Sequence, residues 1–402
     1  MNQRLLSFLV FITILLSTCV WSSLQLGISP WRSVNPILLS VIFLIILFSK
    51  KSPKFRYSFQ NVVSLSLISL YFSVFTSYVL YKQSPIYSIF FVTQLTYGFF
   101  LYFILHKYNF PTKKVINSIT VISVVWVILE IVQQFTYPQL WFARTDNPEK
   151  RMGLIRLYIW GVDFVMIALC YWWGKITNGS SLNKKKILSL CIVLTVGLLC
   201  YASRKHIYAT LMVVLLAIIN MKGSHRALVR FTLLIALSWI LVNFYASFME
   251  ANSQLNEMQG GDGEDFIRIL EFKYFTTDFL HGPFEYCFGV GIPDLPTSMG
   301  RELERLKDMY GFYQSDIGVF GYFTQFGFFG IVPIVMYIFI FLKNWRYIDN
   351  QYRYFFLMKL LLIVFDFWAM WGVGMVAWAL FMYLVDQNIK ENKEKKTKIA
   401  LI

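Results

Sequence analysis

The sequence predicts an all-α polytopic membrane protein, and two observations support this fold class. Of the 402 residues, 57% are hydrophobic and only 15% are charged, whereas soluble domains carry about 25% charged residues. Apolar stretches that approach the length needed to cross a bilayer, about 20 residues, recur along the whole chain. A soluble chain could not bury so much apolar surface. The composition therefore excludes a soluble enzyme, a secreted disulfide-bonded scaffold and a disordered chain.

The order of apolar and polar segments divides the chain into four parts. Residues 1–249 hold transmembrane helices 1–9 with short loops, residues 250–317 form one long loop, residues 318–386 hold helices 10–12, and residues 387–402 form a basic tail. We expect the first span to be a membrane helix and not a signal peptide, because no small-residue cleavage site follows it. The twelve predicted spans are 5–23, 34–49, 62–81, 86–105, 115–135, 157–174, 187–203, 207–221, 231–249, 318–342, 355–371 and 373–386.

The last two predicted spans come from one apolar run that is interrupted at residues 371–374. We interpret this interruption, Trp-Gly-Val-Gly, as a tight helical hairpin. A single long helix is the alternative, and it would give eleven spans and place the tail on the other side of the membrane.

Basic residues indicate how the chain is oriented in the membrane. If the N-terminus is cytoplasmic, the inner side holds 23 of the 37 Lys and Arg residues, and every inner loop is basic. This is the positive-inside pattern, and it explains the net charge of +15 without nucleic acid as a partner. We therefore expect both termini in the cytoplasm, with residues 250–317 on the outer side of the membrane.

The long loop carries more acidic residues than any other segment and contains two expected helices. Residues 264–280 combine charged side chains at near-helical spacing with aromatic residues, which predicts an amphipathic helix on the membrane face. A turn rich in glycine and proline follows, and residues 301–310 are expected to form a charged helix.

Three polar positions in or beside the outer loops are candidates for chemistry. Arg204, Lys205 and His206 stand where a short hairpin leads into a span, and guanidinium beside a helix N-terminus suits a diphosphate. The alternative is that these cations contact lipid headgroups or the acidic outer loop. Arg268 either binds an anion or pairs with Glu264 or Glu271 on its own helix. Asp316 either accepts a proton from a hydroxyl or caps the span that begins at residue 318.

Several other polar or small residues have mainly structural interpretations. Residues 289–293, Gly-Val-Gly-Ile-Pro, are expected to form a turn, and the Gly-x-x-Gly at 327–330 is expected to allow close helix packing. Charged residues inside predicted spans are functional candidates by default. They are Glu130, Asp163, Lys359 and Asp366. Lys359 and Asp366 would lie on one helix face, two turns apart. The five cysteines read as small buried hydrophobic residues, and the histidines lack the company of further metal ligands.

In this order, these features resemble the O-antigen polymerase and O-antigen ligase superfamily, the Wzy-type membrane glycosyltransferases. The matching pieces cover roughly Arg151 to Ile331: Arg-Met-Gly at 151–153, Ser-Arg at 203–204, the long loop with Arg268, Gly-Val-Gly at 289–291 and Gly-x-x-Gly at 327–330. The resemblance implies a C-type glycosyltransferase architecture. It also implies undecaprenyl-diphosphate-linked glycan substrates, transfer at the periplasmic face, and no metal or other cofactor.

The resemblance also implies roles for individual residues. Arg204 and Arg268 match the essential arginines of the family, and Asp316 stands where the ligase branch has a histidine, which favours the polymerase branch. Gly-Val-Asp at 161–163 departs from the family pattern. Residues expected to contact substrate are Arg151, Lys205, His206, Tyr274 and Tyr313, with further sugar stacking by Phe275, Tyr286, Tyr310 and Phe312.

The sequence therefore predicts a polymerase of lipid-linked oligosaccharide repeat units for O-antigen, capsule or another exopolysaccharide. Besides its glycan substrates, membrane lipids and a chain-length regulator are candidate partners. The alternatives are an O-antigen ligase that transfers glycan to the lipid A core and, in a different class, a polysaccharide flippase or other transporter.

Overall fold

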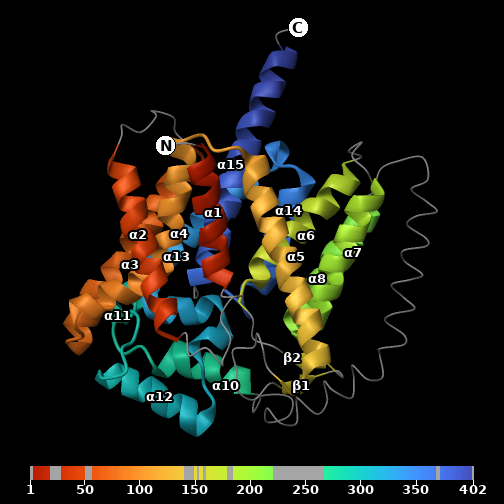
Figure 1. The fold of residues 1–402 in the computed structure, drawn as a ribbon. Helices are drawn as coiled ribbons and strands as arrows, with labels where there is room; N and C mark the ends of the chain where they lie inside the picture. Colours follow the sequence, from red (N-terminus) through yellow and green to blue (C-terminus); the bar gives the residue numbers. More distant parts are fainter. Residues whose placement is uncertain are drawn as a thin grey trace.

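The computed structural model describes residues 3–18, 29–49, 57–139, 149–151, 154–156, 160–178, 184–220, 267–367 and 372–400. The predicted span 231–249, residues 264–266 and Trp371, the first residue of the predicted interruption, lie outside these ranges, whereas residues 372–374 are helical. In the described part, helices stand side by side in one bundle, three shorter helices lie across one end, and the C-terminal helix extends beyond the opposite end (Figure 1).

The helices follow the apolar segments of the sequence closely. In the first half of the chain they are α1 (Gln3–Thr18), α2 (Ser29–Phe48), α3 (Gln60–Tyr81), α4 (Pro85–Lys107), α5 (Thr112–Thr136), α6 (Val162–Thr177), α7 (Lys184–Cys200) and α8 (Arg204–Ile219). A short antiparallel hairpin of β1 (Glu149–Arg151) and β2 (Leu154–Arg156) stands between α5 and α6. Apart from this hairpin, the described secondary structure is helical.

The second half of the chain first forms the short helices that lie across one end of the bundle, which we call the end layer (residues 267–317), and then returns to the bundle. It comprises α10 (Ile267–Lys273), the π-helix η2 (Tyr274–Asp278), α11 (Pro283–Phe288), α12 (Ser298–Tyr310), the 3-10 helix η3 (Gln314–Ile317), α13 (Val319–Lys343), η4 (Trp345–Tyr347), α14 (Asn350–Leu362) and α15 (Gly372–Ala400). The expected amphipathic helix at 264–280 is thus split between α10 and η2, and the expected charged helix begins at Ser298. The expected basic tail continues α15 without a break.

Four of the described helices, α3, α4, α5 and α13, are long and apolar enough to cross a membrane. They also carry large exposed apolar side chains, among them Ile68, Phe135 and Phe339, with exposed fractions of 58%, 84% and 64%. Apolar surface of this extent belongs in a bilayer rather than in water. These helices confirm the prediction of a helical membrane protein.

The described residues form two hydrophobic cores, one within the bundle and one under the end layer. The larger core joins the bundle helices, and close approach is possible because small residues stand at the crossings. A Cβ atom on Gly98 of α4, for example, would lie 2.7 Å from the backbone of Val376 in α15. The smaller core lies under the end layer and includes Phe275, Val290 and Ile317. The end layer is therefore a packed part of the structure.

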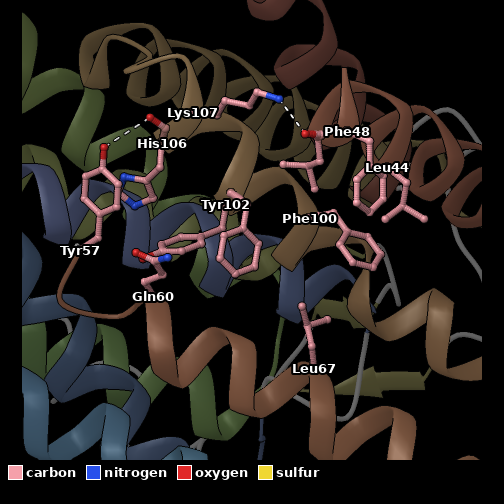
Figure 2. A pocket seen from close by; sticks show the side chains of 11 residues that line it. Leu44, Phe48, Tyr57, Gln60, Leu67, Phe100, Tyr102, His106 and Lys107 are labelled. Carbon is pink, nitrogen blue, oxygen red and sulfur yellow. Dashed lines mark hydrogen bonds between the residues drawn. The ribbon is translucent and has the colours of Figure 1, made fainter. Parts of the chain in front are cut away.

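At the opposite end of the bundle, α2, α3 and α4 enclose a pocket with a volume of about 420 Å³. Figure 2 shows its aromatic and aliphatic walls beside Tyr57, His106 and Lys107. This pocket lies at the ends of α2 and α4 and at the start of α3, so it is separated from the end layer by the length of those helices.

Candidate functional site

Arg268 and Asp316, which the sequence analysis selected independently, form an ion pair in the end layer. Nη1 of Arg268 lies 2.8 Å from Oδ2 of Asp316 and donates to its backbone carbonyl, also at 2.8 Å. The side chains retain 33% and 38% of their accessible surface. The pair is therefore open on one side, where a ligand can approach. Of the other partners expected for Arg268, Glu264 lies outside the described residues.

Glu271, the remaining expected partner of Arg268, has a different position. It lies one helical turn further along α10, is only 1% exposed, and its Oε1 accepts a hydrogen bond of 3.0 Å from the backbone N–H of Tyr313. Its Oε2 is buried and has no hydrogen-bond partner among the described residues. Burial, together with the charge of Asp316, raises the pKa of this carboxyl to about 7, against the hydrogen bond from Tyr313 and the charge of Arg268.

The geometry gives Glu271 a positioning role that the sequence analysis missed. Its hydrogen bond fixes Tyr313, which stands directly before η3, and η3 carries Asp316. The sequence contained one signal for this role: an acid three residues after Arg268, on the same predicted helix face and among aromatic residues.

A second polar cluster forms where α8 begins. Ser203 is extended and precedes Arg204, the first residue of α8. Oγ of Ser203 lies 2.9 Å from Nδ1 of His206, and Nε2 of His206 lies 3.1 Å from Oδ2 of Asp366. Nζ of Lys205 lies 3.4 Å from Oδ1 of Asp366 and donates to the carbonyl of Phe365 at 3.0 Å. Arg204 is half-buried.

Asp366 thus contacts Lys205 and His206, two of the side chains that were expected to contact substrate. The sequence predicts Asp366 on one helix with Lys359, but α14 ends at Leu362 and Asp366 comes after the turn of residues 363–365. Lys359 forms an ion pair with Asp163, in the first turn of α6, instead. Lys359 and Asp366 therefore do not share one helix face as expected, and each pairs with a residue from another helix.

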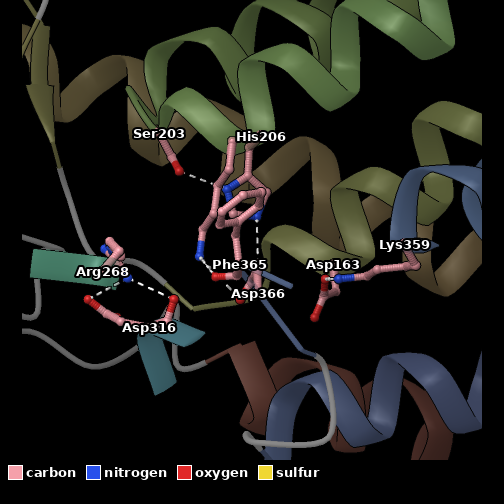
Figure 3. A network of polar contacts seen from close by, with 9 residues as sticks. Asp163, Ser203, His206, Arg268, Asp316, Lys359, Phe365 and Asp366 are labelled. Atoms are coloured by element: carbon pink, nitrogen blue, oxygen red, sulfur yellow. Dashed lines mark hydrogen bonds and ion pairs between the residues drawn. The ribbon is translucent and has the colours of Figure 1, made fainter. Parts of the chain in front are cut away.

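The two clusters lie beside each other because their backbones touch. The N–H of Val319 donates to the carbonyl of Ile363 at 2.9 Å. A Cβ atom on Gly318, whose φ is 56°, would lie 2.3 Å from the carbonyl oxygen of Val364. Asp316 and Asp366 each stand two residues from this contact, and Figure 3 shows their ion pairs in one region of the structure, with Asp163 and Lys359 nearby. Arg268, Asp316, Lys205 and His206 are thus brought together from three separate segments.

The two glycine motifs selected from the sequence meet behind this region. Gly327 has φ of 60° and interrupts the regular helix of α13, and a Cβ atom there would lie 2.5 Å from the backbone of Cys287. The N–H groups of Val290 and Gly291 donate to the carbonyls of Thr324 and Gln325 at 3.0 and 2.8 Å. The two motifs therefore join the end layer to the bundle, in agreement with the structural interpretation of residues 289–293.

Arg151 lies in the β hairpin, which the sequence analysis did not predict. The amide of Gln134 at the end of α5 holds the hairpin through two hydrogen bonds of 2.8 Å to the backbone of Ile155. The same amide nitrogen lies 3.5 Å from the carbonyl oxygen of Cys200, the last residue of α7. The hairpin therefore stands at the same end of the bundle as the start of α8.

The aromatic residues expected to stack on sugars are exposed, half-buried or fully buried. Tyr310 and Tyr313 are 51% and 43% exposed and remain available to a ligand. Phe275 is fully buried in the smaller core, so it serves packing and not sugar contact. Tyr274 is half-buried, and its ring centroid lies 6.1 Å from that of Phe312. Tyr286 is also half-buried, against Phe323.

Among the described residues, no three His, Cys, Asp or Glu side chains are grouped so that they could hold a metal ion. No protein-family model matches the sequence. No curated protein matches it either. The chemistry of this site therefore has to be argued from its own residues.

Proposed function

We propose that this protein is a membrane glycosyltransferase that polymerises undecaprenyl-diphosphate-linked oligosaccharide repeat units. The single observation that carries the proposal is the ion pair of Arg268 and Asp316 beside the basic start of α8. A partly exposed guanidinium next to a carboxylate offers one group for an anionic leaving group and one for the proton of an attacking hydroxyl.

In the proposed reaction the hydroxyl of the acceptor sugar attacks the anomeric carbon of the donor glycan. A new carbon–oxygen bond forms, the bond to the diphosphate oxygen breaks, and its electron pair leaves with the lipid diphosphate. Asp316 accepts the hydroxyl proton. Arg268 and Arg204 stabilise the charge that develops on the diphosphate, because guanidinium groups bind phosphate oxygens through paired donors.

Binding of the diphosphate would exchange one anion for another in front of Arg268. In the structure the guanidinium is occupied by Asp316. When diphosphate oxygens take that position, the carboxylate of Asp316 is released from the guanidinium and can accept a hydrogen bond from the acceptor hydroxyl. Donor binding and base activation are thus coupled through one side chain.

The finer assignments belong to the same proposal. They include twelve spans, a C-type glycosyltransferase architecture and cytoplasmic termini in a bacterial inner membrane. Substrate contacts are assigned to Arg151, Lys205, His206, Tyr274 and Tyr313, and the polymer is O-antigen, capsule or another exopolysaccharide. Exposed Tyr310 and Tyr313 support the sugar contacts because aromatic rings are large apolar surfaces with a polar edge.

The test is a deletion strain whose lipopolysaccharide and capsule are separated on gels. A core capped by one repeat unit without a ladder is expected. Uncapped core with long polymer on the lipid carrier would instead identify a ligase, and carrier-linked single units trapped on the inner leaflet would identify a flippase.

Complementation with point variants then tests the site. Arg204→Ala and Arg268→Ala are expected to leave the ladder absent at normal protein level. Arg305→Ala is the matched control, because Arg305 also lies in the end layer and pairs with Glu302 on its own helix at 2.7 Å. A wild-type ladder in both Arg204→Ala and Arg268→Ala would reject the proposal.

A further inference from the structure

The pocket between α2, α3 and α4 has the size and lining of a ligand site. Its volume of about 420 Å³ falls within the range of small-molecule pockets. Its walls are formed by Leu44 and Phe48 from α2, Leu67 from α3, and Phe100 and Phe103 from α4. Apolar side chains from three helices thus surround a space that is suited to a hydrocarbon chain.

One wall of the pocket is polar. His106 is 3% exposed, and its Nε2 lies 3.3 Å from Oδ2 of Asp386. Nδ1 of His106 and Oε1 of Gln60 are buried without a hydrogen-bond partner among the described residues. Buried polar atoms are normally hydrogen-bonded, so this wall favours a ligand that carries polar groups at one end (Figure 2).

Lys107 brings a positive charge to the edge of the polar wall. Nζ of Lys107 is held beside the pocket by the carbonyls of Ile46 and Leu47, at 3.0 and 2.7 Å. Asp386 is engaged not only by His106 but also by Tyr102 at 2.6 Å and by the N–H of Ser58 at 2.9 Å. Lys113 and Lys114 lie in the first turn of α5 at the same end of the bundle. The charge of Lys107 complements an anionic headgroup.

The pocket is remote from the site proposed above. Gln60, in the pocket wall, begins α3, whereas Gln83, two residues after the end of α3, donates to the carbonyl of Ile292 in the end layer at 2.8 Å. The 22 residues of α3 span about 33 Å. A ligand in the pocket therefore does not contact Arg268 or Asp316.

We infer that this pocket binds an anionic membrane glycerophospholipid, with one acyl chain between α2, α3 and α4 and the headgroup at His106 and Lys107. This inference does not depend on the proposed function. The occupant is taken from the surrounding bilayer because the walls belong to helices with large lipid-facing side chains, such as Ile68 and Phe48.

The experiment uses the full chain in phosphatidylcholine vesicles that contain a minor fraction of phosphatidylglycerol with a diazirine in one acyl chain. After illumination, labelled residues are mapped by mass spectrometry. Labels are expected to concentrate on the lining residues of α2 and α4. The same diazirine on phosphatidylcholine is expected to label them about fivefold less, because one nearby lysine attracts an anionic lipid by about that factor.

Two neighbouring substitutions separate the pocket from the outer surface of α3. Leu67→Trp fills the pocket, and labelling of the lining residues is expected to fall to the level of other lipid-facing helices. Ile68→Trp is the matched control, since Ile68 is 58% exposed and does not line the pocket. If Leu67→Trp fails to fold, competition by unlabelled phosphatidylglycerol on the wild-type protein gives the same test.

Labels spread evenly over lipid-facing residues, or unchanged by Leu67→Trp or by the competitor, would overturn the inference. Equal labelling by the two lipids would overturn the inference that the pocket prefers an anionic headgroup.

Discussion

One nitrogen of the Arg268 guanidinium, Nη1, contacts Asp316 twice, at the side-chain oxygen and at the backbone carbonyl, both at 2.8 Å. The backbone contact holds the arginine beside η3 even when the carboxylate turns away. The pair can therefore open towards a ligand without separating the two segments, which the proposed anion exchange requires.

Asp316→Asn tests the carboxylate as a proton acceptor. The amide keeps the size of the side chain and an oxygen for Arg268 but accepts no proton. If Asp316 is the base, transfer is expected to fall by about 10² to 10⁴. The measurement is polymer formed from lipid-linked repeat units by the purified protein.

Asp308→Asn is the control for Asp316→Asn, since Asp308 lies exposed on α12. Activity close to wild type in Asp316→Asn would remove Asp316 from the chemistry and leave it as a partner of Arg268. Binding of the lipid-linked donor, measured separately, is expected to survive the substitution.

Glu271 makes stability depend on pH. Its pKa is raised by burial to about 7 in the folded protein, whereas the unfolded carboxyl titrates near 4.3. Folding is therefore favoured most below the unfolded pKa, and stability is lost as the pH rises towards 7. The loss is on the order of 3 kcal/mol. Thermal unfolding of the purified protein from about pH 5 to about pH 8 checks this direction.

Glu271→Gln isolates that contribution. The amide oxygen can still accept the hydrogen bond from Tyr313, but the side chain no longer ionises. The decline of unfolding temperature with rising pH is expected to be smaller than in the wild type, and Glu304→Gln, at an exposed position of α12, is expected to leave it unchanged. An identical decline in Glu271→Gln and in wild type would contradict the assignment.

Because Lys359 and Asp163 form a buried ion pair, replacing both is expected to destabilise the protein less than replacing Lys359 alone. Lys359 is 2% exposed, so Lys359→Met leaves the Asp163 carboxylate buried without its cation and is expected to cost about 3 to 5 kcal/mol. Adding Asp163→Leu removes the unpaired charge, and most of the loss is expected to return. Unfolding temperatures of the two single variants and the double variant measure this coupling, and additive losses would exclude it.

Gly327→Ala tests the junction between the end layer and the bundle. The positive φ of Gly327 and the 2.5 Å approach of its Cβ position to Cys287 are expected to make the substitution destabilising by about 1 to 3 kcal/mol. Gly282→Ala is the matched control, because a Cβ atom there meets no other atom within 4 Å. Equal unfolding temperatures for the two variants would show that the junction tolerates a side chain.

The sequence alone was sufficient to predict the limits of the four long apolar helices. The limits of α3, α4, α5 and α13 fall within three residues of the predicted spans, because a bilayer requires one long apolar stretch for each crossing. The β hairpin escaped prediction because each strand has only three residues. No periodic pattern can emerge over so short a length.

Non-local pairing limited the prediction of the site. The residues Arg204, Lys205, His206, Arg268 and Asp316 were selected from the chemistry of their side chains. Their partners were not, since Lys205 meets Phe365 across 160 positions and Lys359 meets Asp163 across 196. The end of α14 at Leu362 depends on the same contacts, because the residues after it pack against Gly318 and bind α8. Composition alone favours a helix there.

The continuity of α15 has a mechanical consequence. Its first half is buried against α4, where Gly98 approaches Val376, and its last turns are exposed and rich in lysine, with no break between the two parts. A helix of 29 residues is a rod of about 43 Å that bends only gently. Torque applied to the lysine-rich end is transmitted along the rod to Asp386 and, through Tyr102, to α4. The C-terminal segment is therefore a lever fixed in the bundle, and not a loose tether.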